Sequence, residues 1–197
     1  QAAARIATAR LAAAVVNIYD PAGEKIASAA KGVVRTYGLS PLAGVRGRIE
    51  EINLARLKAT GYARQLHHWV LADDSGLAVD FLHGAPGVLS ARYAGPDAND
   101  EANNRRLLEE LRAVPPADRT ARFVCHMALA DPAGAIRAEA EGSCRGRILT
   151  ERRGAAGFGY DPLFEIAEYH RSFGELDAMV KSCLSHRARA ARALIPK

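Results

Sequence analysis

The sequence predicts an α/β protein, and three stretches carry that prediction. The run from His68 to Ala72 is apolar and contains β-branched and aromatic residues, which predicts a short buried strand. Residues 49–66 carry apolar side chains at helical spacing, so they predict a long amphipathic helix. Residues 119–130 alternate between apolar and polar side chains, as a long strand does. Helices and strands therefore share one chain.

Composition bounds the class of protein. The chain has 197 residues, of which 49% are hydrophobic and 25% charged, as in ordinary globular proteins. We expect an Ala-rich N-terminal extension over residues 1–13 and a single domain over residues 14–197. No apolar run reaches the 18 or more residues that span a bilayer, so no membrane partner is expected. Three cysteines without metal-ligand spacing suit a reducing cytoplasm. The net charge of +5 suits a polyphosphate ligand, and no nucleic-acid recognition motif is present.

Further secondary structure follows from periodicity and turn signals. Within residues 49–66, Leu57 is expected on the buried side with its apolar neighbours. Ser172 and Glu175 form a capping-box pattern, so a helix is expected to begin near Gly174, and Ser185 can cap a last helix. The remaining predicted strands span residues 14–19, 41–45, 77–82, 135–140 and 145–150, and the remaining predicted helices span residues 24–37, 98–114 and 187–195.

Two adjacent carboxylates, Asp73 and Asp74, follow the strand that ends at Ala72. Open α/β sheets bind ligands at the carboxyl ends of their strands, so this is a candidate site. Adjacent side chains on extended backbone point to opposite faces, and only one of the two need face a pocket. The alternative is a polar turn in which Asp or Ser caps the next element.

A glycine-rich loop over residues 154–162 contains Phe158, Tyr160 and Asp161. Glycines beside an aromatic ring leave its face open for a flat ligand, and a carboxylate nearby can accept N–H groups of a base. The alternative is that these aromatic rings fill the core. His186, beside Arg187 at the start of the last helix, is alternatively a capping or surface residue.

Near the N-terminus, a strand, a Gly-containing turn and a helix start make an arrangement that favours anions. Lys25 stands in the first turn of that helix and could add a charged contact. Glu50 and Glu51 stand in the first turn of the helix over residues 49–66, where the helix dipole alone favours carboxylates.

Five motifs in one order resemble those of the inosine triphosphate pyrophosphatase family, from about Asn53 to the C-terminus. They are Ala72-Asp73-Asp74-Ser75-Gly76-Leu77, Gly84-Ala85-Pro86-Gly87, Ser90-Ala91-Arg92-Tyr93, Phe158-Gly159-Tyr160-Asp161-Pro162 and Ser185-His186-Arg187. The resemblance implies a central mixed sheet with flanking helices that form two lobes around a substrate cleft, usually in a homodimer. It also implies Mg2+-dependent hydrolysis of ITP, dITP and XTP to monophosphate and pyrophosphate.

The resemblance also implies roles for single residues. Asp74 would bind the metal and activate water. The substrate-binding residues would be Ser75, Phe158 stacking on the purine, Gly159, Tyr160 and Asp161 reading its edge, and Lys181, His186 and Arg187 completing the base and phosphate pocket. The chemistry agrees, because a triphosphate needs cations to offset its charge, and a 6-keto purine needs donors at its carbonyl.

The N-terminal third departs from the family pattern. The best equivalent of its phosphate loop is the stretch from Tyr19 to Lys25, with Asp20 where Asn is expected, and Lys25 is the expected phosphate lysine. No Glu stands at the usual upstream metal position, so Glu50 or Glu51 is the expected substitute. Two alternatives to an active enzyme of this family therefore stay open: a Maf-like nucleotide pyrophosphatase, and a non-enzymatic nucleotide-binding protein with a degraded phosphate loop.

Overall fold

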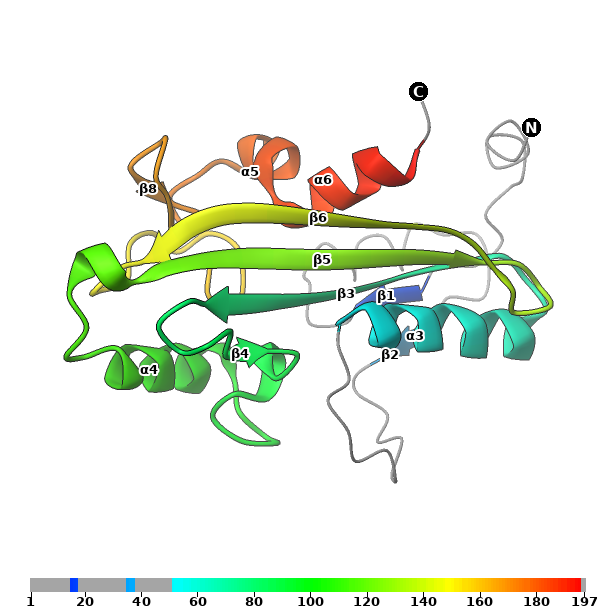
Figure 1. The fold of residues 1–197 in the computed structure, drawn as a ribbon, viewed down its shortest axis with the longest axis horizontal. Helices are drawn as coiled ribbons and strands as arrows, with labels where there is room; N and C mark the ends of the chain where they lie inside the picture. Colours follow the sequence, from blue (N-terminus) through cyan, green and yellow to red (C-terminus); the bar gives the residue numbers. More distant parts are fainter. Residues whose placement is uncertain (1–14, 18–34, 38–50, 196–197) are drawn as a thin grey trace. The chain divides into compact units, whose positions relative to one another are not determined.

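A computed structural model of the chain describes residues 15–17, 35–37 and 51–195 (Figure 1). The chain divides into two compact units. The first unit comprises residues 1–74, 126–141 and 191–197, and the second comprises residues 75–125 and 142–190. The predicted extension over residues 1–13 lies outside the described residues. Within the part of the chain that is described, no helix has the length and apolar character that a membrane crossing requires.

Six strands form the larger sheet, in the order β4-β3-β5-β6-β7-β8. Figure 1 shows the two longest, β5 and β6, side by side. Strand β4 pairs antiparallel with β3, and β7 pairs antiparallel with both β6 and β8. The strands are β3 (Val70–Val79), β4 (Pro86–Gly87), β5 (Thr120–Ala130), β6 (Ile136–Ile148), β7 (Phe164–Ile166) and β8 (Arg171–Ser172).

The helices are α3 (Glu51–Leu66), α4 (Asp100–Glu110), α5 (Ala178–Leu184) and α6 (His186–Leu194), with 3-10 turns at Ser90–Arg92 and Pro116–Asp118. The α/β fold class is confirmed, as are the strand over residues 119–130 and the last helix. Ser185 caps that helix as predicted, because its hydroxyl accepts a hydrogen bond from the Ala188 N–H at 3.2 Å.

A second, two-stranded sheet pairs β1 (Val15–Asn17) with β2 (Arg35–Tyr37) in parallel. The prediction of one helix over residues 24–37 is wrong at its end, because Tyr37 pairs with Asn17 in this sheet. Short apolar runs do not distinguish strand from helix by periodicity alone. Residues 18–34 and 38–50 lie outside the described part. They include Lys25, Glu50, the rest of that predicted helix and the predicted strand over residues 41–45.

In the first unit, helix α3 packs through small side chains. Ala55, Ala59 and Ala63 recur every four residues and are fully buried, in a cluster with alanines and Val70 of the sheet. Leu57, which was predicted to be buried, is 48% exposed. It lies two residues, about 200° around the helix, from Ala55, so it points away from this stripe. The alanine stripe, and not Leu57, marks the buried face of α3.

In the second unit, aromatic side chains fill the core. Phe123 of β5 lies 4.6 Å from Phe164 of β7 between ring centroids, and Phe164 stacks on Phe173 at 5.4 Å. Leu107 and Leu111 at the C-terminal end of α4 are fully buried in the same cluster. The predicted helix over residues 98–114 is shorter than expected, because Asn99 caps it and α4 ends at Glu110.

Three further predictions are corrected. The strand predicted to end at Ala72 continues through Asp73 and Asp74 to Val79, so the carboxylates lie in the middle of β3 and not at its end. The two strands predicted over residues 135–140 and 145–150 are one strand, β6. Gly142 lies within β6 because α6 packs on it closely: a Cβ there would be 2.2 Å from the Ala190 nitrogen.

The helix predicted to begin near Gly174 begins instead at Ala178. Ser172 and Glu175 do make half of a capping box, since the Ser172 N–H donates to Glu175 Oε2 at 2.8 Å. The Ser172 hydroxyl donates to the Arg153 carbonyl at 2.6 Å, and Ser172 is the last residue of β8 and not the cap of a helix. Asp177 caps α5 by accepting from the Met179 N–H at 2.7 Å.

Candidate active site

Strand β3 carries the two adjacent carboxylates of the candidate site. Asp74, whose side chain is 15% exposed, accepts a hydrogen bond from Lys58 Nζ of α3 at 2.5 Å. The same ammonium also donates to the Asp73 carbonyl at 3.2 Å. The side chain of Lys58 therefore points to Asp74. The result is a partly buried carboxylate whose negative charge is balanced by a fixed cation.

The metal residues expected from the sequence are only partly described. Asp74 is placed, Glu51 is the first residue of α3, and Glu50 lies outside the described residues. Among residues that the structure describes, no three His, Cys, Asp or Glu side chains gather as a metal site. Mg2+ usually takes one or two carboxylates and completes its shell with substrate phosphates and water. Asp74 supplies one such carboxylate, whereas Asp73, its neighbour on β3, points to the opposite face of the strand.

In the second unit, the glycine-rich loop closes on a buried carboxylate. Asp161 is 4% exposed, accepts a hydrogen bond from the Phe158 N–H at 2.8 Å and forms an ion pair with Lys181 of α5. Burial raises the pKa of the Asp161 carboxyl, and the Lys181 ammonium works against that rise. The loop is thus fixed to α5 through Asp161.

The ring of Phe158, which is half-buried, is contacted by two cations. Lys181 Nζ lies 4.4 Å from its centroid and the Arg187 guanidinium carbon of α6 lies 5.9 Å from it. A cation over an aromatic face is attracted by the ring quadrupole, so Lys181 is held by both Asp161 and Phe158. The structure therefore brings together four of the predicted site residues: Phe158, Asp161, Lys181 and Arg187.

Tyr160 and His186 are placed in the core of the second unit. Tyr160 is 3% exposed, donates its hydroxyl to the Ser90 carbonyl at 2.9 Å, and its pKa is raised chiefly by burial. The His186 ring is 7% exposed and stacks on Phe123, with ring centroids 4.8 Å apart. The alternative that loop aromatics fill the core therefore describes Tyr160 but not the half-buried Phe158. Ser75, also in this unit, is half-buried on β3.

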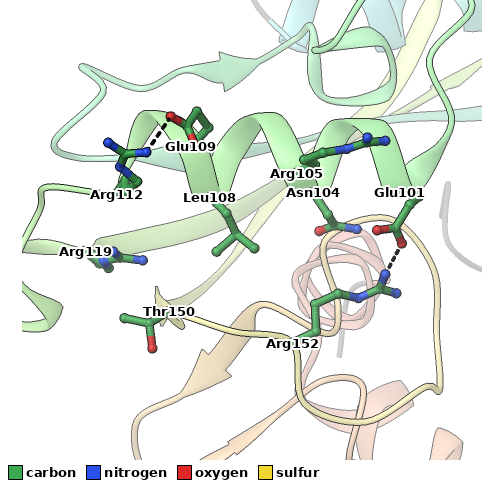
Figure 2. A pocket seen from close by; sticks show the side chains of 9 residues that line it. All are labelled: Glu101, Asn104, Arg105, Leu108, Glu109, Arg112, Arg119, Thr150 and Arg152. Carbon is green, nitrogen blue, oxygen red and sulfur yellow. Dashed lines mark hydrogen bonds and ion pairs between the residues drawn. The ribbon is translucent and has the colours of Figure 1, made fainter.

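An open cavity of about 450 Å³ lies in the second unit, between α4 and the chain around Arg152 (Figure 2). None of the predicted site residues lines it. Three of the arginines that line it have partners within the unit. Arg152 pairs with Glu101, Arg112 pairs with Glu109, and Arg119 donates to three backbone carbonyls. These three arginines therefore serve the unit's own structure.

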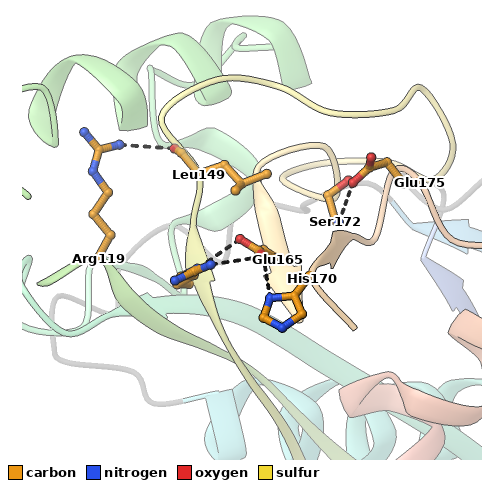
Figure 3. A network of polar contacts seen from close by, with 7 residues as sticks. Arg119, Leu149, Glu165, His170, Ser172 and Glu175 are labelled. Atoms are coloured by element: carbon orange, nitrogen blue, oxygen red, sulfur yellow. Dashed lines mark hydrogen bonds and ion pairs between the residues drawn. The ribbon is translucent and has the colours of Figure 1, made fainter. Parts of the chain in front are cut away.

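A separate polar network fixes the end of β6 against β7 (Figure 3). Arg147 contacts Glu165 through two hydrogen bonds of 2.9 and 3.1 Å, and His170 Nδ1 lies 3.8 Å from the same carboxylate. Glu165 is 2% exposed, and its hydrogen bond with Arg147 is the main cause that lowers its pKa. This buried, paired carboxylate holds the strands together.

Together these features define a class: an α/β protein whose second unit gathers an aromatic ring, two cations and a buried carboxylate, and whose first unit carries a carboxylate paired with a lysine. The chain belongs to the Ham1 family, which matches residues 22–197. The sequence-based resemblance is therefore confirmed.

Curated relatives and solved structures agree. A Rhodopirellula baltica protein named dITP/XTP pyrophosphatase is 61% identical over 143 residues, which is 73% of this chain and 69% of that protein. A Bacillus cereus protein of the same name is 49% identical over 144 residues, 73% of this chain and 70% of the other. The solved structure of a HAM1 protein from Coxiella burnetii has a TM-score of 0.75 at 31% identity, covering 93% of this chain and 96% of that one.

Proposed function

We propose that this protein is a nucleoside triphosphate pyrophosphatase. It hydrolyses the non-canonical purine nucleotides ITP, dITP and XTP to the monophosphate and pyrophosphate and so removes them from the nucleotide pool. The observation that carries the proposal is the 61% identity to a protein named dITP/XTP pyrophosphatase, over 143 residues. The arrangement of side chains in each unit supports it.

In this proposal the second unit binds the base. The purine stacks on the ring of Phe158, and Arg187, which lies close to the same ring, donates to the purine 6-carbonyl. Adenine carries an amino group at that position. Both this amino group and the Arg187 guanidinium are hydrogen-bond donors, so each would be left without an acceptor. Gly159, Tyr160, Asp161 and His186 shape this pocket, with Asp161 holding Lys181 in place.

In the first unit, Asp74 is the general base. It accepts a proton from a water whose oxygen attacks the α-phosphorus, while the bond from that phosphorus to the bridging oxygen breaks and pyrophosphate leaves. Lys58 holds the carboxylate through a 2.5 Å contact, which orients the oxygen that takes the proton. Ser75, the next residue along β3, contacts the substrate. Lys58 thereby becomes a positioning residue, a role that the sequence did not assign.

Magnesium would be held by Asp74 together with Glu50 or Glu51, and when bound it would polarise the phosphoanhydride and offset its charge. Lys25 would contact the phosphates. This set belongs to the proposal, because Lys25 and Glu50 lie outside the described residues.

A homodimer and a cytoplasmic location belong to the same proposal. The chain's three cysteines, Cys125, Cys144 and Cys183, form no disulfide, which suits a reducing compartment. Light scattering on the purified protein tests the dimer: a mass of one chain at micromolar concentration would contradict it.

The experiment that tests the function is pyrophosphate release from ITP, XTP, ATP and GTP, with and without Mg2+. We expect Mg2+-dependent release from ITP and XTP. Asp74→Asn should lower the rate by about 10²-fold or more, since it removes the general base, whereas Asp80→Asn, a surface control on the same chain, should leave it unchanged. An Asp74→Asn variant that keeps more than about a tenth of the rate would sink the assignment. Rates on ATP and GTP equal to those on ITP and XTP would favour the Maf-like alternative. Nucleotide binding without turnover would favour the non-enzymatic nucleotide-binding alternative.

A further inference from the structure

Helix α4 forms hydrogen bonds with both backbone groups of one residue, Gly159, in the glycine-rich loop over residues 154–162. The Gly159 N–H donates to Asp100 Oδ2 at 2.6 Å, and Asn104 Nδ2 donates to the Gly159 carbonyl at 2.8 Å. Asp100 and Asn104 stand one helical turn apart, so they lie on one face of α4. Two side chains of one helix thus hold a single glycine.

The geometry fixes which end of the Asn104 amide faces the loop. Nδ2 donates to two carbonyls, those of Gly159 and Asp100, each at 2.8 Å. The reverse orientation would place the amide oxygen against two carbonyl oxygens, which repel it. Asn104 is 1% exposed, and Figure 2 shows its side chain reaching from α4 toward the loop that carries Arg152. Only a donor in this place satisfies Gly159.

The loop needs external anchors. Gly154, Gly157 and Gly159 all have positive φ, and glycine loses more backbone freedom on ordering than any other residue. Around Gly159, no atom beyond its chain neighbours lies within 4 Å of the position that a Cβ would take. Packing therefore does not hold this residue, and its peptide hydrogen bonds do.

We propose that Asp100 and Asn104 are positioning residues for the purine site. They fix Gly159, and with it the adjacent ring of Phe158, while Asp161 fixes the Phe158 N–H from the other side at 2.8 Å. Successive peptide groups are thus held by α4 and by Asp161, and the ring is oriented before the base arrives. This inference rests on the proposed function, because it assumes that Phe158 binds a base.

The structural half of the inference is tested by hydrogen exchange of the free protein. Asp100→Ala removes the acceptor for the Gly159 N–H, and Asn104→Asp replaces the donor with an oxygen while keeping the volume. We expect amides 158–160 to exchange at least about tenfold faster in both variants, the loss of one or two net hydrogen bonds. Asp100→Asn keeps an acceptor oxygen and should restore protection, and Glu109→Ala on the exposed side of α4 should leave it unchanged. Equal exchange in all variants would overturn the anchoring.

The functional half is tested by steady-state kinetics on ITP and ATP. Asp100→Ala and Asn104→Asp should raise KM for ITP by about five- to tenfold and shrink the ITP-over-ATP ratio of kcat/KM. Inhibition by pyrophosphate, which uses only the phosphate side, should stay unchanged. Faster exchange without a change in KM would overturn the positioning role. Failure of the wild-type protein to hydrolyse ITP would instead overturn the proposed function. Hydrogen exchange would still test whether Asp100 and Asn104 hold the loop. Asp100 is exposed, so Asp100→Ala is informative even if Asn104→Asp fails to fold.

Discussion

The ion pair between Asp161 and Lys181 should stabilise the second unit measurably, and its truncation is the first prediction. Asp161 accepts hydrogen bonds from both the Phe158 N–H and Lys181. The side chain of Asp161 is only 5% exposed and that of Lys181 only 19%. Asp161→Ala would leave an amide without its acceptor and an ammonium without its counter-charge. Asp161→Asn would keep the acceptor and lose the charge.

The structure sets the expected size of the loss. Removing one partner of a buried ion pair costs about 3–5 kcal/mol. Lys181 can turn toward solvent, and it keeps its contact with Phe158 at 4.4 Å, so it escapes part of that cost. We expect the free energy of unfolding to fall by about 2–3 kcal/mol in Asp161→Ala and by about 1 kcal/mol in Asp161→Asn. For a chain of this length the larger loss lowers Tm by roughly 4–12 °C.

The assay is urea unfolding of the wild type, Asp161→Asn, Lys181→Met and the double variant. A coupling energy of about 1–2 kcal/mol is expected, because each single change removes the same contact. Asp97→Ala, an exposed carboxylate of the same unit, is the control and should fall within about 0.5 kcal/mol of the wild type. Coupling indistinguishable from zero would refute the reasoning and reduce the pair to a surface contact.

Three more predictions follow from single side chains. Arg187→Ala should shrink the ITP-over-ATP ratio of kcat/KM by about 1–3 kcal/mol, and an unchanged ratio removes Arg187 from base reading. Lys25→Ala should weaken triphosphate binding far more than nucleoside binding, and equal losses in calorimetry would show that another lysine holds the phosphates. Because Arg147 lowers the pKa of Glu165, the pair stabilises the fold above the unfolded-state pKa of about 4.3 and the effect is lost as pH falls through the folded-state pKa. Arg147→Ala should therefore cost unfolding free energy at pH 7 and little at pH 2, and equal cost at both would contradict the linkage.

Periodicity predicted most of the strands and helices that the structure describes, and two of its failures share a physical cause. The strand predicted to stop at Ala72 runs on through two aspartates, because the polar side chains lie half-buried in mid-strand and need no turn. Strand β6 likewise passes through Gly142, where the approach of α6 demands a glycine. In both places a tertiary contact decided what a local turn signal appeared to decide.

The site divides in the same way. Phe158, Asp161 and Arg187 stand in motifs that predicted the candidate site, whereas Lys181 stands in none of them and was expected only from the family resemblance. Lys58 and Asn104 could not be found from motifs, because their roles come from what lies opposite them in space. One signal for Lys58 was available: most of the chain's 27 basic residues are arginine, so a lysine is itself unusual. Lysine supplies a compact point charge where arginine supplies a broad planar group.

The bond that the enzyme cuts is identified by product analysis after incubation with ITP and Mg2+. Attack of water on the α-phosphorus predicts one pyrophosphate for each IMP formed, with no IDP at any time. Accumulation of IDP together with orthophosphate would show cleavage at the terminal phosphate and would rule out attack at the α-phosphorus.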